Sequence, residues 1–77
     1  MKYVAYLDKD GNGLSETEPK LAMVPAGKNA EEFAEAFFND NACQKAVLFE
    51  QYQYANAALT MSVSWDDVEK GKIKEWP

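Results

Sequence analysis

Apolar residues recur with two different periods along this chain, and the periods separate one helix from several strands. Between residues 29 and 40 they return every three or four positions, so Phe33 and Phe37 share a face with neighbouring alanines. Asn29 can cap the free amides of the first turn, and Glu32 follows three positions later, as in a capping box. We therefore predict an amphipathic helix over residues 29–40 with one face to bury.

The remaining apolar segments are typical of strands, because they are short and rich in β-branched and aromatic residues. We predict strands over residues 2–7, 20–24, 45–54 and 57–65. The last has the clearest alternation, and one of its faces carries Leu59, Met61, Val63 and Trp65. We expect this face to pack against Phe33 and Phe37. The opposite side of the sheet would then receive Val4 and Tyr6.

Turn-forming residues separate these segments. Residues 8–13 are Asp-Lys-Asp-Gly-Asn-Gly, and Pro25 and Gly27 follow the second strand. Ser64 can cap a short helical turn that ends near Gly71, and residues 72–77 form either a tail or a short strand. The predicted fold class is α+β, in the order β-β-α-β-β followed by the helical turn. It is a small antiparallel sheet of three to four strands with the helix packed on one face, within a single domain over residues 1–77.

Composition excludes several classes of function. The chain has 77 residues and a net charge of −5, all eight basic residues are lysine, and neither arginine nor histidine is present. Arginine normally carries the bidentate recognition of phosphate and guanine, so direct binding of nucleic acid is disfavoured. Without histidine, Ser-His and Cys-His catalytic pairs and histidine zinc sites cannot form. We expect a non-enzymatic protein without a cofactor.

The sequence also lacks the marks of export. No apolar run approaches the roughly 18 residues of a membrane span, and Asp8 interrupts the first apolar segment before a signal-peptide core could form. The single cysteine, Cys43, cannot form an internal disulfide and is typical of a small buried residue. We expect a cytoplasmic protein that does not contact a membrane.

Residues 8–13 resemble the first half of an EF-hand calcium loop. Its first, third, fifth and sixth positions are matched by Asp8, Asp10, Asn12 and Gly13. The twelfth position, a bidentate glutamate in that family, falls on Pro19, and a predicted strand precedes the loop where the family has a helix. Asp-Gly and Asn-Gly are also common turn sequences. We predict a turn and no metal site, with a calcium loop at Asp8, Asp10 and Asn12 as the alternative.

Two sets of side chains are candidates for contact with a partner. The outer face of the predicted helix is acidic, and Glu31 and Glu35 lie one turn apart at a cost of roughly 0.2–0.5 kcal/mol, with no lysine placed on the helix to compensate. Tyrosine and tryptophan are enriched at protein contacts because they bring area with little entropy to lose. The candidate partner-binding residues are Glu31, Glu32, Glu35, Asp40, Tyr6, Tyr52, Tyr54 and Trp76.

The sequence therefore predicts a small acidic protein-binding module that blocks a basic surface of a larger protein, with a nucleic-acid-processing protein as a candidate target. In size and charge it resembles the short acidic inhibitors of phages and mobile elements, such as anti-CRISPR proteins. DNA carries one charge per ~1.7 Å of axis, so this sparser charge favours local blockade over mimicry of a duplex. The alternatives are a calcium-binding module and a structural homodimer whose paired sheets bury the tyrosines.

Overall fold

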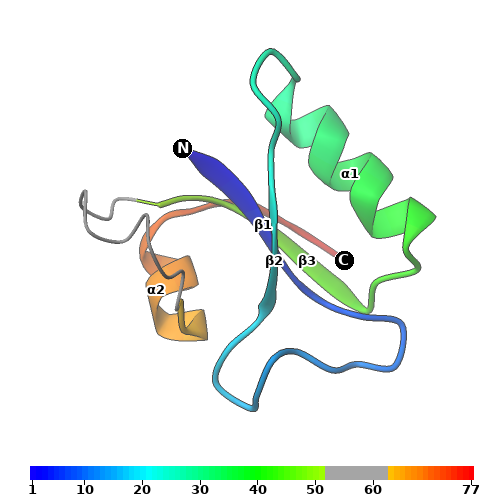
Figure 1. Ribbon diagram of the computed structural model, residues 1–77, viewed down its shortest axis with the longest axis vertical. Coiled ribbons are helices and arrows are strands. Elements are labelled where there is room, and N and C mark those ends of the chain that lie inside the picture. Colours follow the sequence, from blue (N-terminus) through cyan, green and yellow to red (C-terminus); the bar gives the residue numbers. More distant parts are fainter. Residues whose placement is uncertain (52–62) are drawn as a thin grey trace.

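The chain folds into an antiparallel sheet with a helix on each face (Figure 1). The computed structural model describes residues 1–51 and 63–77. In these residues the elements are β1 (Lys2–Leu7), β2 (Lys20–Met23), α1 (Ala30–Asp40), β3 (Lys45–Glu50), α2 (Trp65–Lys70) and β4 (Lys72–Trp76). Four strands pair in the order β2-β1-β3-β4. The predicted α+β class, with one longer helix and a short C-terminal helix, is confirmed.

Strand β3 lies in the middle of the sheet and forms much of the core. It pairs with β1 from Lys2 opposite Glu50 to Leu7 opposite Lys45, and with β4 on its other side. Its four central residues, Ala46 to Phe49, are fully buried. A strand that is apolar on both sides can sit there because helices cover both faces of the sheet.

Helix α1 covers one face of the sheet. Its buried Ala34 packs in one cluster with Val4 and Leu48, and the rings of Phe33 and Phe37 pack around this cluster. The side-chain oxygen of Asn29 accepts a hydrogen bond from the Glu32 amide at 2.9 Å, which starts the helix as the sequence predicts. The amphipathic period therefore identified both the helix and the side it buries.

Helix α2 covers the opposite face. Its Val68 packs with Ala5, Val47 and Phe49 in a second cluster. Ser64 and Asp67 form a capping box, in which the Ser64 hydroxyl accepts from the Asp67 amide and the Asp67 carboxylate accepts from the Ser64 amide, both at 3.2 Å. This confirms the predicted helical turn after residue 64 and explains how a helix of one and a half turns is held.

Gly71 closes α2 because only a residue without a side chain fits there. A Cβ atom on Gly71 would come within 2.2 Å of the Glu50 carbonyl oxygen. The Glu50 amide in turn donates to the Gly71 carbonyl at 3.0 Å. The close approach lets the chain leave α2 and enter β4 directly beside β3.

Among the described residues, the fourth strand of the sheet is β4. Strand β4 consists of residues 72–76, for which the sequence predicts a tail or a short strand. Of the predicted strand 57–65, residues 57–62 lie outside the described residues, and Val63 and Ser64 lead into α2, which Trp65 begins. The capping box starts a helix where alternation predicted a strand to end. The predicted third strand ends at Glu50, and residues 52–54 also lie outside the described residues.

The assignment of side chains to the two faces was also wrong. Val63 is buried beside Val68, on the α2 side, and does not pack against the phenylalanines of α1. Val4 and Tyr6 face α1, and the Tyr6 ring lies edge-on to Phe37 with 4.8 Å between ring centroids. Alternation along β1 shows which residues share a face. It does not show which helix covers that face, because both faces of the strand are apolar.

Neither helix within residues 1–51 and 63–77 combines the length and the apolar character that crossing a membrane requires.

Candidate functional site

The outward face of α1 is acidic and almost unneutralised. Glu31, Glu32, Glu35 and Asp40 are all exposed on it. The Glu31 carboxylate lies 3.7 Å from the Lys74 ammonium group on β4. The other three carboxylates have no ion pair in the described part of the chain. All eight lysines belong to that part, and none of them lies within ion-pair distance of these three acids.

This arrangement is unfavourable for the helix itself. Glu35 lies one turn after Glu31, a like-charge spacing that costs roughly 0.2–0.5 kcal/mol. Asp40 lies in the last turn, where the helix dipole disfavours an anion by roughly 0.3–1 kcal/mol, and no basic residue accompanies it. Only Glu31 and Glu32, in the first turn, are favoured by the dipole. The acidity of α1 is therefore not explained by the stability of the helix.

An open groove runs beside these acids, between α1 and β4. It has a volume of about 530 Å³, and its lining combines apolar Ala30, Leu48 and Ile73 with Lys2, Asn29, Glu31, Glu32 and Glu35. Ile73 is 45% exposed although it lies on a strand. Lysine and arginine side chains have an apolar stem and a charged head, which match an apolar floor with an acidic rim. The groove thus has the chemistry to receive a basic side chain.

Trp76 lies next to the same site, on the α1 side of the sheet. It is half-buried and packs against the α1 cluster, and the Lys74 ammonium group lies 5.3 Å from the centre of its ring. Lys74 therefore bridges Glu31 and Trp76. Tyr6 is half-buried on the same side of the sheet, so neither residue belongs to a separate tyrosine-rich face. Tyr52 and Tyr54 lie outside the described residues.

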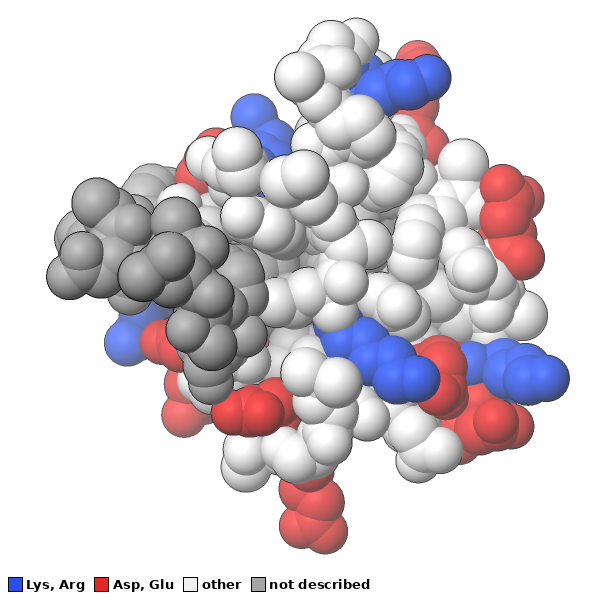
Figure 2. Space-filling view, viewed as in Figure 1, with Lys and Arg blue, Asp and Glu red and all other residues white. Residues whose placement is uncertain are grey.

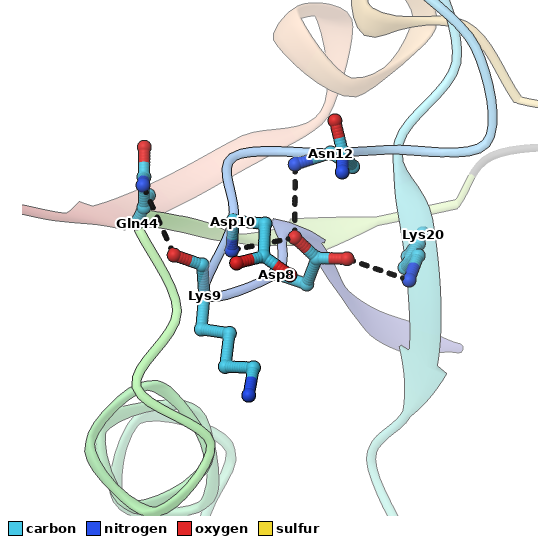
Figure 3. Close-up of polar contacts among 6 residues, drawn as sticks. All are labelled: Asp8, Lys9, Asp10, Asn12, Lys20 and Gln44. Carbon is cyan, nitrogen blue, oxygen red and sulfur yellow. Dashed lines mark hydrogen bonds and ion pairs between the residues drawn. The ribbon is translucent and has the colours of Figure 1, made fainter.

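The loop that resembles a calcium site is organised by internal bonds of Asp8 (Figure 3). One carboxylate oxygen accepts from the amides of Asp10 and Asn12, both at 2.9 Å, and the other accepts from the Lys20 ammonium group at 2.8 Å. The bond from Lys20, followed by that from the Asn12 amide, lowers the pKa of Asp8 from 3.8 to about 2. The ammonium group of Lys20 occupies the position that a cation would take against Asp8.

Two further contacts fix this loop to the protein. Gln44, in the connection between α1 and β3, donates through its side-chain nitrogen to the Lys9 carbonyl at 3.0 Å (Figure 3). Gly11 has a φ of +83°, and a Cβ there would lie 2.9 Å from the Gln44 side-chain oxygen. Across residues 1–51 and 63–77, no three acidic, histidine or cysteine side chains converge as metal ligands would. The geometry gives Asp8 a structural role in the turn.

Cys43 is buried and 6% exposed. Its burial raises the pKa of the thiol, which lowers the thiolate fraction at neutral pH. The thiol lies 3.9 Å from the Phe37 carbonyl oxygen, at the C-terminal end of α1. Cys43 therefore packs as a small apolar residue, as the sequence predicts.

The sequence pattern did not predict the contribution of β4 to the acidic site. Residues 72–76 supply Lys74, which pairs with Glu31, and Ile73, which lines the groove. Ile73 and Trp76 are typical of a strand, but the segment is short and its other residues are charged. Only its pairing with β3 brings it beside α1.

Comparison with models of known protein families, with curated proteins and with solved structures found no match to this chain.

Proposed function

We propose that this chain is a non-enzymatic, cytoplasmic protein-binding module that uses α1 to occupy a basic surface of a larger protein. The observation that carries the proposal is that three exposed carboxylates on α1 have no ion pair within residues 1–51 and 63–77, namely those of Glu32, Glu35 and Asp40. These charges cost the helix stability, which favours a role for them in a contact with another molecule. A basic surface would neutralise them on binding and would be steered to them in solution.

The groove beside α1 supports the same function. An acidic rim alone would bind cations weakly, because exposed ion pairs contribute about 0–1 kcal/mol each. The half-exposed side chain of Ile73 adds apolar area that a lysine or arginine stem can bury. Binding of this kind blocks the partner's basic surface, which is how a small acidic protein inhibits a protein that handles nucleic acid.

The test compares two double charge reversals in a quantitative pull-down. Glu32→Lys with Glu35→Lys changes the proposed site and leaves the Glu31–Lys74 pair intact. Glu16→Lys with Asp66→Lys is the matched control, because both acids are exposed, neither has an ion pair among the described residues, and Asp66 stands in a first helical turn as Glu32 does. The two variants have the same net charge.

We expect the wild-type chain and the control to capture the same protein from a lysate, and the α1 variant to lose it. Circular dichroism of each variant establishes that it is folded. A protein captured equally by the wild type and by both variants would remove α1 from the binding mechanism. If both variants fail to capture the protein, the interaction depends on the net charge of the chain and not on α1, which would contradict the proposed site.

A further inference from the structure

The two edges of the sheet differ in how they are protected. Exposed edge strands can pair with foreign chains, and proteins often prevent this with charged residues, especially lysine. At the β4 edge, Lys72 forms ion pairs with Glu69 and Glu75, and Lys74 with Glu31. The β2 edge carries one charged residue, Lys20, which is neutralised by Asp8. The rest of β2 is uncharged.

The view of the molecule in Figures 1 and 2 faces the β2 edge. In Figure 1, β2 lies in front of β1, with α1 and α2 to either side. In Figure 2 much of the upper part of this side is uncharged, one basic side chain with an acidic neighbour lies just below its middle, and the other charged side chains lie towards the margins. Met1 is 70% exposed and Met23 is 54% exposed. An acidic protein thus presents an uncharged, partly apolar surface around this edge.

The register of β2 shows which of its backbone groups point away from β1. The Val24 amide donates to the Lys2 carbonyl at 3.1 Å, and Tyr3 lies opposite Met23. Hydrogen-bonded and non-hydrogen-bonded pairs alternate in an antiparallel ladder, so the amide and carbonyl groups of Leu21 and Met23 point away from β1. These four groups form a template for one further strand.

A groove at the end of β2 identifies the chemistry of that strand. Its volume is about 550 Å³, and its lining consists of Met1, Lys2, Met23, Val24, Pro25, Ala26, Lys28 and Ala30. Most of these residues are apolar, and the charged side chains are the two lysines, without a carboxylate. Lys28 has no ion pair in the residues that the structure describes, although the chain has a net charge of −5.

We propose that the β2 edge binds an extended segment of a partner protein, with apolar side chains and a carboxylate placed near Lys28. The segment adds to the sheet beside β2 and bonds to the outward groups of Leu21 and Met23. Its apolar side chains cover Met1 and Met23, and its carboxylate pairs with Lys28. The strands β2 and β4 are the opposite edges of the sheet, and the two grooves adjoin at Lys2 and Ala30. The proposal rests on the outward groups of β2 and on Lys28, and it does not use the α1 carboxylates.

The probe is a capped six-residue peptide in which valine alternates with glutamate, titrated into the 15N-labelled full chain. Two controls are the same peptide with lysine for glutamate and the same peptide with every backbone amide N-methylated, which removes the hydrogen-bond donors on both edges of the strand. We expect saturable shifts of the Leu21, Met23 and Lys28 amides at millimolar peptide, and none with either control. Equal binding of the methylated peptide, shifts confined to α1 or β4, or no saturable shift would overturn the proposal.

Two variants test the contacts one at a time. Met23→Pro removes an outward amide and keeps the β1 ladder, because proline is tolerated where the N–H faces solvent. It should abolish the shifts while the fold is retained, whereas Met23→Leu should bind as the wild type. Lys28→Glu should lower the affinity of the protein for the glutamate peptide about fivefold, because an exposed ion pair contributes up to about 1 kcal/mol. Unchanged affinity for Lys28→Glu and Met23→Pro would contradict this site.

The competing occupant of the edge is a second copy of the chain. Sedimentation of the wild type over a range of concentrations distinguishes it from a partner segment. We expect a monomer whose mass does not change with concentration. A dimer that Met23→Pro converts to monomer would assign the edge to self-association and overturn the proposed partner.

Discussion

The carboxylate of Glu31 lies 3.7 Å from the ammonium group of Lys74, and this pair joins the first turn of α1 to the edge strand β4. Both side chains are half exposed or more, so the pair contributes at most about 1 kcal/mol to stability. Its main effect is on charge. Glu31 is neutralised within the protein, and the unpaired acids of α1 are Glu32, Glu35 and Asp40 in the described part of the chain.

Phe37→Ala should lower the free energy of unfolding by about 3 kcal/mol. The ring packs edge-on against Tyr6 and tilts against Phe33, with 6.0 Å between the latter centroids. Phenylalanine to alanine in a core costs roughly 3–5 kcal/mol, and the low end applies because this ring is half-buried. Urea unfolding measures the change, with exposed Asn39→Ala as the control. A loss below about 1 kcal/mol would mean that α1 does not rely on this contact.

The salt bridge of Asp8 should make part of the stability dependent on acid pH. The pKa of Asp8 is lowered from 3.8 to about 2, chiefly by the bond from Lys20. A folded-state pKa below the unfolded value stabilises the protein above pH 3.8, and the contribution is lost as pH falls towards 2. The free energy of unfolding, measured with urea between pH 6 and pH 2, should therefore fall less steeply with decreasing pH for Asp8→Asn than for the wild type.

The matched control for this pH dependence is Asp10→Asn, because the Asp10 carboxylate makes none of the bonds that hold Asp8 (Figure 3). The free energy of unfolding of the control should change with pH as steeply as that of the wild type. Identical slopes for Asp8→Asn and the wild type would show that the bond to Lys20 does not persist in solution.

Millimolar calcium should leave the melting temperature of the protein unchanged. Both oxygens of Asp8 already accept hydrogen bonds, and the Lys20 ammonium group lies 2.8 Å from one of them. A ligand at ~100 times its dissociation constant would add about 2.7 kcal/mol, which a thermal melt detects readily. A rise in melting temperature that Asp8→Ala abolishes would instead establish a calcium site in this loop.

The elements that the sequence predicted well are those specified by local patterns. Asn29 and the spacing of Phe33 and Phe37 identify α1, and Ser64 identifies the start of α2. The exposed acids of α1 follow from the same helical period. Their positions were therefore readable from residues 29–40 alone.

The features that could not be predicted depend on contacts between distant segments. Strand β4 is short and charged, and it is a strand because it pairs with β3. That pairing places Lys74 beside Glu31 and Ile73 beside Leu48, which creates the groove. The side of the sheet that Val4 and Tyr6 occupy also depends on where α1 docks, since both faces of β1 are apolar. The period of apolar residues along the chain predicts neither the pairing of β4 with β3 nor the face on which α1 docks.

The association rate constant of Glu32→Lys with Glu35→Lys, measured at several salt concentrations against the captured partner, tests the central claim most directly. Electrostatic steering raises association rates by roughly tenfold or more and weakens as salt screens the charges. We predict that this variant associates about tenfold more slowly at low salt and shows a flatter salt dependence, while Glu16→Lys with Asp66→Lys associates at the wild-type rate. Equal rates and equal salt dependence for the two variants would contradict a binding role for the acidic face of α1.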